Sequence, residues 1–141
     1  MSNIDLSQLI TPETKQARRR AEKFAKLADL RWKRETGGIS LEGGMRVNTS
    51  RESQAQIAAS VQSIEAGLLT EPVDWKLETG WVELTADQIL TIAQAVADHV
   101  QRCFAAERRV AARMESLAGD LSDVDVAHAF DDAYDALMRA G

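Results

Sequence analysis

The sequence has few cysteine, proline and aromatic residues and no long apolar run. Its single cysteine, Cys103, excludes an internal disulfide framework and fits a reducing compartment. No apolar stretch approaches the roughly 18 to 20 residues that a membrane-spanning helix needs, which excludes an α-helical transmembrane protein. The N-terminus lacks the basic-then-apolar pattern of a signal peptide, so we expect no secretion by that route.

Residue types used in catalysis and metal binding are also scarce. His99 and His128 are the only histidines, and with one cysteine they cannot form a standard zinc site. The C-terminal aspartates do not follow the EF-hand spacing, because Ala127 and His128 occupy loop positions five and six counted from Asp123. Phosphate-binding glycine motifs and a nucleophile elbow are missing. We therefore expect no enzyme activity, metal, cofactor or small-molecule substrate, and we interpret Cys103 as a buried, inert thiol rather than a nucleophile.

The composition is that of a folded protein with unevenly distributed charge. Hydrophobic residues make up 45% of the 141 residues, which is too many for a wholly disordered chain and suits one domain with a core. The net charge is −5. Residues 15–34 carry nine basic and two acidic residues, a net charge of +7, whereas residues 120–141 carry six acidic residues and one basic, a net charge of −5. Such asymmetry often marks an interacting terminus.

The two charged segments predict two interaction faces. The basic face consists of Arg18, Arg19, Lys23 and Lys26, and the acidic face of Asp131, Asp132 and Asp135. The basic segment could bind nucleic acid or an acidic surface, such as the tail of the same or a neighbouring chain. Residues 18–20 are three consecutive arginines, which spread over about 200° of a helix, and no nucleic-acid-binding module accompanies them. We therefore favour a solvated or protein-facing basic helix, and we expect the basic and acidic ends of one chain, or of neighbouring chains, to meet electrostatically.

A long helix is predicted near the N-terminus. Thr11-Pro12-Glu13 supplies a cap, a proline at the first helical position and an acidic first turn, and Gly37-Gly38 supplies a stop after about Thr36. An apolar stripe runs along this helix at three- and four-residue spacing, formed by Ala17, Ala21, Phe24, Ala28 and Trp32, with Leu27 beside it. Residues 1–10 are interpreted as a flexible arm.

Two short β-hairpins and a middle helix follow. The alternating segments 39–41 and 45–47 flank Glu42-Gly43-Gly44 and predict the first hairpin, and Val73–Leu77 and 81–84 predict the second. Thr49-Ser-Arg-Glu52 reads as a capping box for a helix that ends near residues 67–70. Three tryptophans are interpreted as structural, with Trp75 and Trp81 stacked across the second hairpin and Trp32 closing the core; a ligand-binding aromatic platform is the alternative.

The longest periodic signal begins at the capping box Thr85-Ala-Asp-Gln88 and predicts a helix to about residue 117 or 118. Apolar residues recur along it every seven residues, with a second line four residues on that Glu107 interrupts. A sustained seven-residue repeat favours packing along another helix. We therefore predict an oligomer or partner interface formed by Ile89, Val96, Val100, Cys103, Val110, Met114 and Leu117.

An acidic helix is predicted at the C-terminus. Gly119 breaks the long helix, Ser122-Asp-Val-Asp125 starts the last one, and Phe130, Tyr134 and Leu137 form its apolar face. The expected fold is thus helix-dominated α+β. It has a long N-terminal helix, two hairpins, a middle helix and a long heptad helix in one domain over 11–118, with the acidic helix at 119–141.

Several segments resemble a domain of unknown function that recurs in proteins of tailed bacteriophages. The resemblance covers about residues 30–117. It is carried by Arg31-Trp-Lys-Arg-Glu-Thr-Gly-Gly-Ile39, by Asn48-Thr-Ser-Arg-Glu-Ser-Gln-Ala55, by Val73-Asp-Trp-Lys76 with Gly80, and by the run from Leu84 to Glu107. That family occurs in tail-fibre, tail-associated and fibre-assembly proteins, and it offers no catalytic residues to transfer.

The resemblance implies a non-enzymatic structural component of a phage or prophage tail, in the tail-tip or fibre region. Its partners would be other tail proteins and copies of itself, with a trimer expected by analogy to tail fibres. It would be found in the virion tail, and in the host cytoplasm during assembly. One alternative is a tail-fibre assembly chaperone that is absent from the mature virion. Another is a nucleic-acid-binding protein that uses the basic helix.

Overall fold

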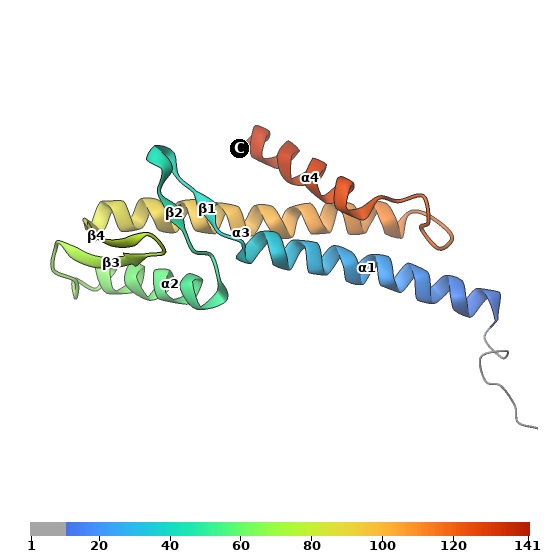
Figure 1. Ribbon diagram of the computed structural model, residues 1–141, viewed down its shortest axis with the longest axis horizontal. Helices are drawn as coiled ribbons and strands as arrows, with labels where there is room; N and C mark the ends of the chain where they lie inside the picture. Colours follow the sequence, from blue (N-terminus) through green and yellow to red (C-terminus); the bar gives the residue numbers. More distant parts are fainter. Residues whose placement is uncertain (1–10) are drawn as a thin grey trace, which may run out of the picture. The chain divides into compact units, whose positions relative to one another are not determined.

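The computed structural model in Figure 1 describes residues 11–141 and contains, within that range, four α-helices and two antiparallel β-hairpins. This arrangement confirms the helix-dominated α+β class. The expected arm, residues 1–10, lies outside the described residues. The chain divides into two compact units. We call residues 32–104 the central unit, and residues 11–31 with 105–141 the terminal unit.

The elements follow one another in the predicted order. They are α1 (Pro12–Thr36), β1 (Ile39–Ser40), the 3-10 turn η2 (Glu42–Gly44), β2 (Arg46–Val47), α2 (Arg51–Glu65), β3 (Val73–Leu77), β4 (Gly80–Leu84), α3 (Ala86–Glu115) and α4 (Val126–Ala140). The border between the units falls inside α1, after Arg31, and inside α3, after Phe104.

Both hairpins form separate two-stranded sheets. In the first, Ile39 pairs with Val47 across the predicted Glu42-Gly43-Gly44 turn. In the second, Val73 pairs with Leu84, and alternate residues of β3 are partly buried, as the sequence pattern predicts. Two strands are too few to form a stable sheet alone, so each hairpin needs an apolar partner surface.

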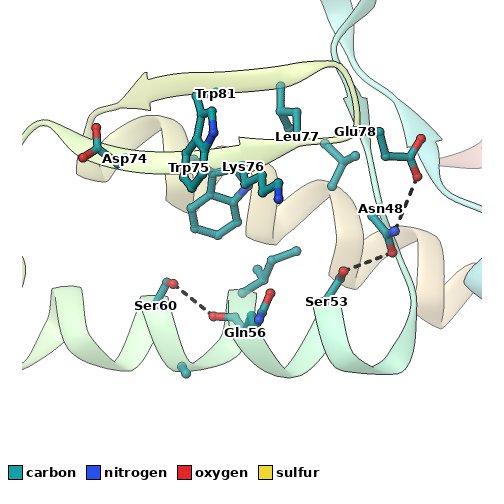
Figure 2. A pocket seen from close by; sticks show the side chains of 13 residues that line it. Asn48, Ser53, Gln56, Ser60, Asp74, Trp75, Lys76, Leu77, Glu78 and Trp81 are labelled. Carbon is teal, nitrogen blue, oxygen red and sulfur yellow. Dashed lines mark hydrogen bonds between the residues drawn. The ribbon is translucent and has the colours of Figure 1, made fainter.

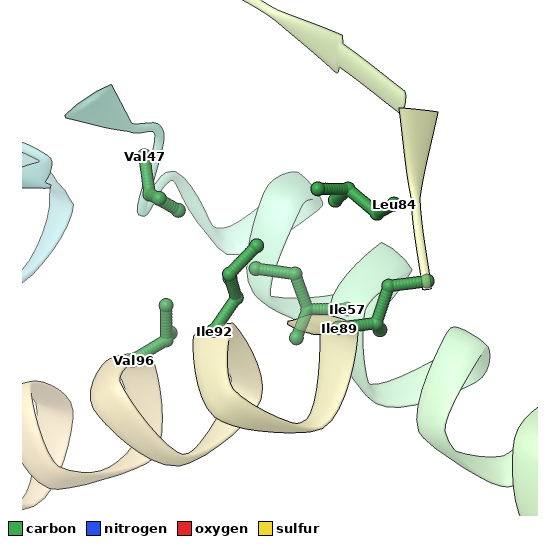
Figure 3. Packing of buried hydrophobic residues seen from close by; sticks show 6 residues of the cluster. All are labelled: Val47, Ile57, Leu84, Ile89, Ile92 and Val96. Atoms are coloured by element: carbon green, nitrogen blue, oxygen red, sulfur yellow. The ribbon is translucent and has the colours of Figure 1, made fainter. Parts of the chain in front are cut away.

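That partner surface is the hydrophobic core of the central unit (Figure 3). Ile89, Ile92 and Val96 line one side of α3 at three- and four-residue spacing, and each is at most 4% exposed. The other members of the cluster come from β2, α2 and β4, namely Val47, Ile57 and Leu84. The core therefore holds both hairpins and α2 against the first part of α3.

The helix starts confirm two of the predicted caps and correct a third. Thr11 accepts a hydrogen bond from the Thr14 backbone N–H at 3.1 Å, and Thr85 accepts one from the Gln88 N–H at 3.2 Å, as predicted. The cap of α2 is Ser50 rather than Thr49, and the cap of α4 is Asp125, the last residue of the predicted start Ser122-Asp-Val-Asp125. Thr49 is unavailable as a cap because its hydroxyl is fully buried and bonded elsewhere.

The buried face of α1 differs from the predicted apolar stripe. Ala17, Ala21, Ala28 and Trp32 are exposed and Phe24 is only partly buried, whereas Leu27 and Glu35 are 1% and 0% exposed. Leu27 and Glu35 are eight residues apart and therefore share a helix face. Glu35 can be buried because its carboxylate is hydrogen-bonded, and apolar periodicity does not predict such a residue.

The terminal unit has its own buried residues. Leu27 of α1, Val110 and Met114 of α3, and Phe130 and Tyr134 of α4 are each at most 5% exposed. The predicted apolar face of α4 is thereby confirmed for its two aromatic residues.

Candidate functional site

Glu35, near the C-terminal end of α1, is the most deeply buried charged side chain in the described chain. Its carboxylate accepts hydrogen bonds from Arg51 Nε at 2.5 Å, Arg51 Nη2 at 3.0 Å and Gln54 Nε2 at 3.0 Å. A buried carboxylate is tolerable only when it is paired and hydrogen-bonded in this way. Glu35 thus ties the end of α1 to the first turn of α2.

Thr49 completes this network beneath the chain reversal between the two helices. Its hydroxyl donates to the Glu35 carbonyl at 2.7 Å and accepts from the Gly38 N–H at 2.8 Å. Gly38 has a φ of +86°, and a Cβ there would lie 3.1 Å from the Val47 carbonyl oxygen, so glycine is required. The network fixes the path of the chain from α1 into the first hairpin and back.

Sequence reasoning did not select Glu35, Thr49, Arg51 or Gln54 as site residues. All four lie in the two segments that carry the family resemblance, Arg31–Ile39 and Asn48–Ala55. A signal was present: Glu35 is eight residues after Leu27 on one face of a strongly basic helix, where an acid needs a partner.

His99 is buried, with 3% of its surface exposed. Its Nε2 lies 3.0 Å from the Arg34 carbonyl oxygen and therefore carries the proton that it donates. Burial is the main cause that lowers the pKa of His99. The Cys103 sulfur lies 3.8 Å from Nε2 and 4.0 Å from Nδ1. Cys103 is 0% exposed, which favours the inert-thiol interpretation.

The seven-residue line is already covered within the chain. Ile89, Val96, Cys103, Val110 and Met114 are each at most 4% exposed, and Val100 packs against the core cluster. Leu117 is the exception at 41% exposed, because it lies beyond the end of α3. The expectation that this line packs on another chain therefore needs correction, because the chain itself buries these residues.

Glu107, which interrupts the second apolar line, has a partner in α1. Its carboxylate lies 3.2 Å from Arg31 Nε, and both side chains are largely buried. Glu107 is therefore accommodated in the apolar line by an ion pair within the chain.

Part of the basic segment is engaged inside the terminal unit. Arg20 donates to the carbonyls of Met114, Leu117 and Gly119 at 3.0, 2.7 and 3.2 Å, at and just beyond the C-terminal end of α3, where the helix dipole favours a cation. Lys23 donates to the Val124 carbonyl at 2.8 Å. Arg19 pairs with Asp120 at 3.5 Å, and this confirms one contact between the basic and acidic segments.

The other predicted face residues lie on the surface. Arg18 and Lys26 of α1 are exposed, as are Asp131, Asp132 and Asp135 of α4. His128 Nε2 lies 3.1 Å from Asp132. The acidic face of α4 is therefore accessible.

The tryptophans do not pack as predicted. Trp32 is 46% exposed, and the Arg51 guanidinium lies 5.1 Å from its ring centroid, so it does not close the core. The cross-strand partner of Trp75 is Val82, whereas that of Trp81 is Lys76, whose ammonium lies 5.7 Å from the Trp81 ring. Directly opposed residues share a face of the ladder, so the predicted stack of Trp75 on Trp81 is wrong.

Both hairpin tryptophans instead line a cleft in the central unit. The cleft lies between α2 and the β3–β4 hairpin and has a volume of about 620 Å³. Figure 2 shows Trp75 extending from β3 toward α2, with Gln56 and Ser60 on the helix below. This volume falls in the range of about 300 to 1,000 Å³ typical of small-molecule sites. The cleft is the strongest candidate binding site among the described residues.

Within residues 11–141, no group of three or more His, Cys, Asp or Glu side chains is placed to hold a metal ion. No helix in that same range combines the length and apolarity needed to cross a membrane.

Comparison with known proteins places the chain in a family. A search of curated proteins and a search of solved structures each found no match. A family model described as a domain of unknown function, DUF4376, matches residues 18–135. The match includes the segments that form the Glu35 network and extends into α4, beyond the end of the resemblance near residue 117. The chain therefore belongs to the DUF4376 family.

Proposed function

We propose that this protein is a non-enzymatic structural component of a bacteriophage or prophage tail, in the tail-tip or fibre region, acting through protein–protein contacts. The resemblance of its segments to a domain found in tail-fibre and tail-associated proteins supports the tail assignment. The geometry supports a structural role through one observation, the Glu35 network: the family-like segments 31–39 and 48–55 use their polar side chains to build the fold.

The buried polar side chains that could take part in chemistry are hydrogen-bonded within the fold. Glu35 is held by Arg51 and Gln54, and the Thr49 hydroxyl bridges two backbone groups. His99 donates to a backbone carbonyl at the end of α1. Every buried side-chain nitrogen and oxygen of the described chain has a hydrogen-bond partner. These groups favour a rigid scaffold whose contacts with partners are made at the surface.

The acidic face of α4 is the surface that fits a protein partner. Asp131 and Asp135 are one turn apart, Asp132 is beside them, and all three are exposed. Met138 on the same helix is 58% exposed and adds an apolar contact. The opposite face of α4 is fixed by Phe130 and Tyr134. The partner in this proposal is a neighbouring tail protein with a basic surface.

Self-association, with a trimer as the expected state, remains part of the proposal. The surface used for self-association is not the seven-residue line of α3, because the residues of that line from Ile89 to Met114 are covered within the chain. Light scattering of the purified protein measures the state, and a strict monomer at micromolar concentration counts against it.

The test is quantitative mass spectrometry of purified particles from the phage or prophage that encodes the chain. We expect the protein in a fixed copy number per particle. In complementation, the triple variant D131N/D132N/D135N should lower incorporation. The control E52Q/E65Q/E83Q changes the net charge equally at exposed positions of the central unit and should incorporate normally.

Two outcomes would replace the proposal. Absence from mature particles, with binding to a tail protein during assembly, would favour the assembly chaperone. Strong retention on heparin with a steep salt dependence would favour nucleic-acid binding. Arg19, Arg20 and Lys23 are engaged within the terminal unit, which speaks against that second alternative.

A further inference from the structure

The cleft between α2 and the β3–β4 hairpin combines aromatic rings with a dense polar lining. Trp81 is 70% exposed, the most exposed tryptophan of the chain, and Trp75 is half-buried. An indole that lines a cleft offers a ligand a flat apolar face and an N–H donor. Val47 and Ile57 belong to the hydrophobic core and also border the cleft, so its floor is rigid.

The polar groups of the cleft fall into two sets. Asn48 is pre-oriented: its Oδ1 accepts from the Ser53 hydroxyl at 3.0 Å, and its Nδ2 donates to Glu78 Oε1 at 3.4 Å (Figure 2). Gln56 and Asp74 line the cleft with exposed side chains, for which no hydrogen bond is found within residues 11–141. The cleft thus offers a fixed amide together with an amide and a carboxylate that are available to a ligand.

The charge of the lining argues against ionic ligands. Asp74, Lys76 and Glu78 give the cleft a net charge of −1. An anion such as phosphate would face two carboxylates, while the nearby ammonium of Lys76 lies against the Trp81 ring. A cationic ligand would compete with Lys76 for that same ring.

A fully apolar ligand fits no better. An apolar helix laid in the cleft would desolvate Gln56, Asp74 and Ser60 without providing hydrogen bonds, and each such group carries a penalty. A ligand that suits both sets of side chains has apolar C–H faces for the indoles and many hydroxyls for the amides and carboxylates.

We propose that this cleft binds a carbohydrate, with one hexopyranose ring packed against Trp75 and bonded through its hydroxyls to Gln56 and Asn48. A second ring reaches Trp81 and Asp74, which line the cleft from the other face of the β3–β4 hairpin. This chemistry is shared by free oligosaccharides and by surface polysaccharides. The site is separate from the α4 face used in the proposed function, so either assignment can fail without the other.

The first experiment is titration with intrinsic fluorescence. W32F leaves Trp75 and Trp81 as the only tryptophans, and both line the cleft. The probes are oligosaccharides of glucose, galactose, mannose and N-acetylglucosamine, and, in a second arm, delipidated bacterial surface polysaccharide. A saturable change with any probe supports the proposal, and the two arms distinguish a free sugar from a surface glycan. No change with any probe up to millimolar concentration overturns it.

Matched variants in the full chain then locate the site by calorimetry. W81A and Q56A should each weaken binding roughly tenfold, the loss of about one good contact. W32A removes an exposed tryptophan outside the cleft, and Q62A removes an exposed glutamine of the same helix outside the cleft; both should bind as the parent does. Circular dichroism checks that W81A and Q56A are folded. Saccharide binding that survives both cleft variants overturns the proposal, as does binding of peptides with no saccharide binding.

Discussion

Replacing Thr49 with valine tests whether the buried network holds α1 to the start of α2. Valine keeps the branched shape but removes the hydroxyl that bonds the Glu35 carbonyl at 2.7 Å and the Gly38 N–H at 2.8 Å. Each buried backbone group left unpaired costs about 1 to 3 kcal/mol. Gly38 is only partly buried, so water recovers some of that loss, and we expect T49V to lose about 2 to 4 kcal/mol in total.

Thr49→Ser is the matched control. Serine keeps both hydrogen bonds and loses one buried methyl, which costs about 1 kcal/mol. Stability is measured by urea unfolding with tryptophan fluorescence, which reports on the central unit because Trp32, Trp75 and Trp81 all lie there. With a slope of about 2 kcal/mol per molar urea, the T49V midpoint should fall by about 1 to 2 M. Equal midpoints for T49V and T49S would refute the reasoning.

Three other perturbations test separate contacts. Burial lowers the pKa of His99 in the folded chain. Below about pH 6.5, His99 therefore binds a proton more readily in the unfolded chain than in the folded chain. The urea midpoint should be constant above that pH and should fall below it. H99Q should flatten this fall and the exposed-site control H128Q should not, whereas an unchanged fall in H99Q would refute the assignment. Arg20→Ala should destabilise the chain by about 1 to 2 kcal/mol through its lost carbonyl contacts, measured by circular dichroism, while the exposed Arg18→Ala should change little; equal effects would argue against a specific contact. Thr85→Ala should cost about 1 kcal/mol of unfolding free energy as a lost helix cap, and an unchanged thermal midpoint would show that the cap is unimportant.

Local signals predicted the elements of the fold well. Gly37-Gly38 ended α1, the glycine-rich turn produced the first hairpin, and Thr85 and Gln88 capped α3. These features depend on residues a few positions apart, and the chemistry of caps and turns is local.

Tertiary pairing was less accessible to sequence reasoning. A seven-residue repeat indicates that one face of the helix is buried, but it does not indicate whether the segment that covers this face belongs to the same chain. An apolar pattern predicts that Trp32 is buried and Glu35 is exposed, whereas the structure shows the reverse. Arg51 contacts both side chains, because its guanidinium lies over the Trp32 ring and bonds the Glu35 carboxylate. The cleft was missed as a site because Asn48, Gln56 and Asp74 are distant in sequence; only the aromatic-platform alternative for the tryptophans pointed toward it.

The central structural claim is that the heptad line of α3 is covered by its own chain, which leaves function to other surfaces. Cys103 lies in the middle of that line, is 0% exposed and is the only cysteine. Its rate of reaction with a thiol reagent in the native protein can be followed over a wide range of protein concentration. The exposed control is Leu117→Cys in a Cys103→Ala background.

The account predicts slow labelling of Cys103 at a rate independent of protein concentration, with rapid labelling of the Leu117→Cys control. Labelling of Cys103 that accelerates on dilution would show that separating subunits uncover the line, and it would contradict the claim.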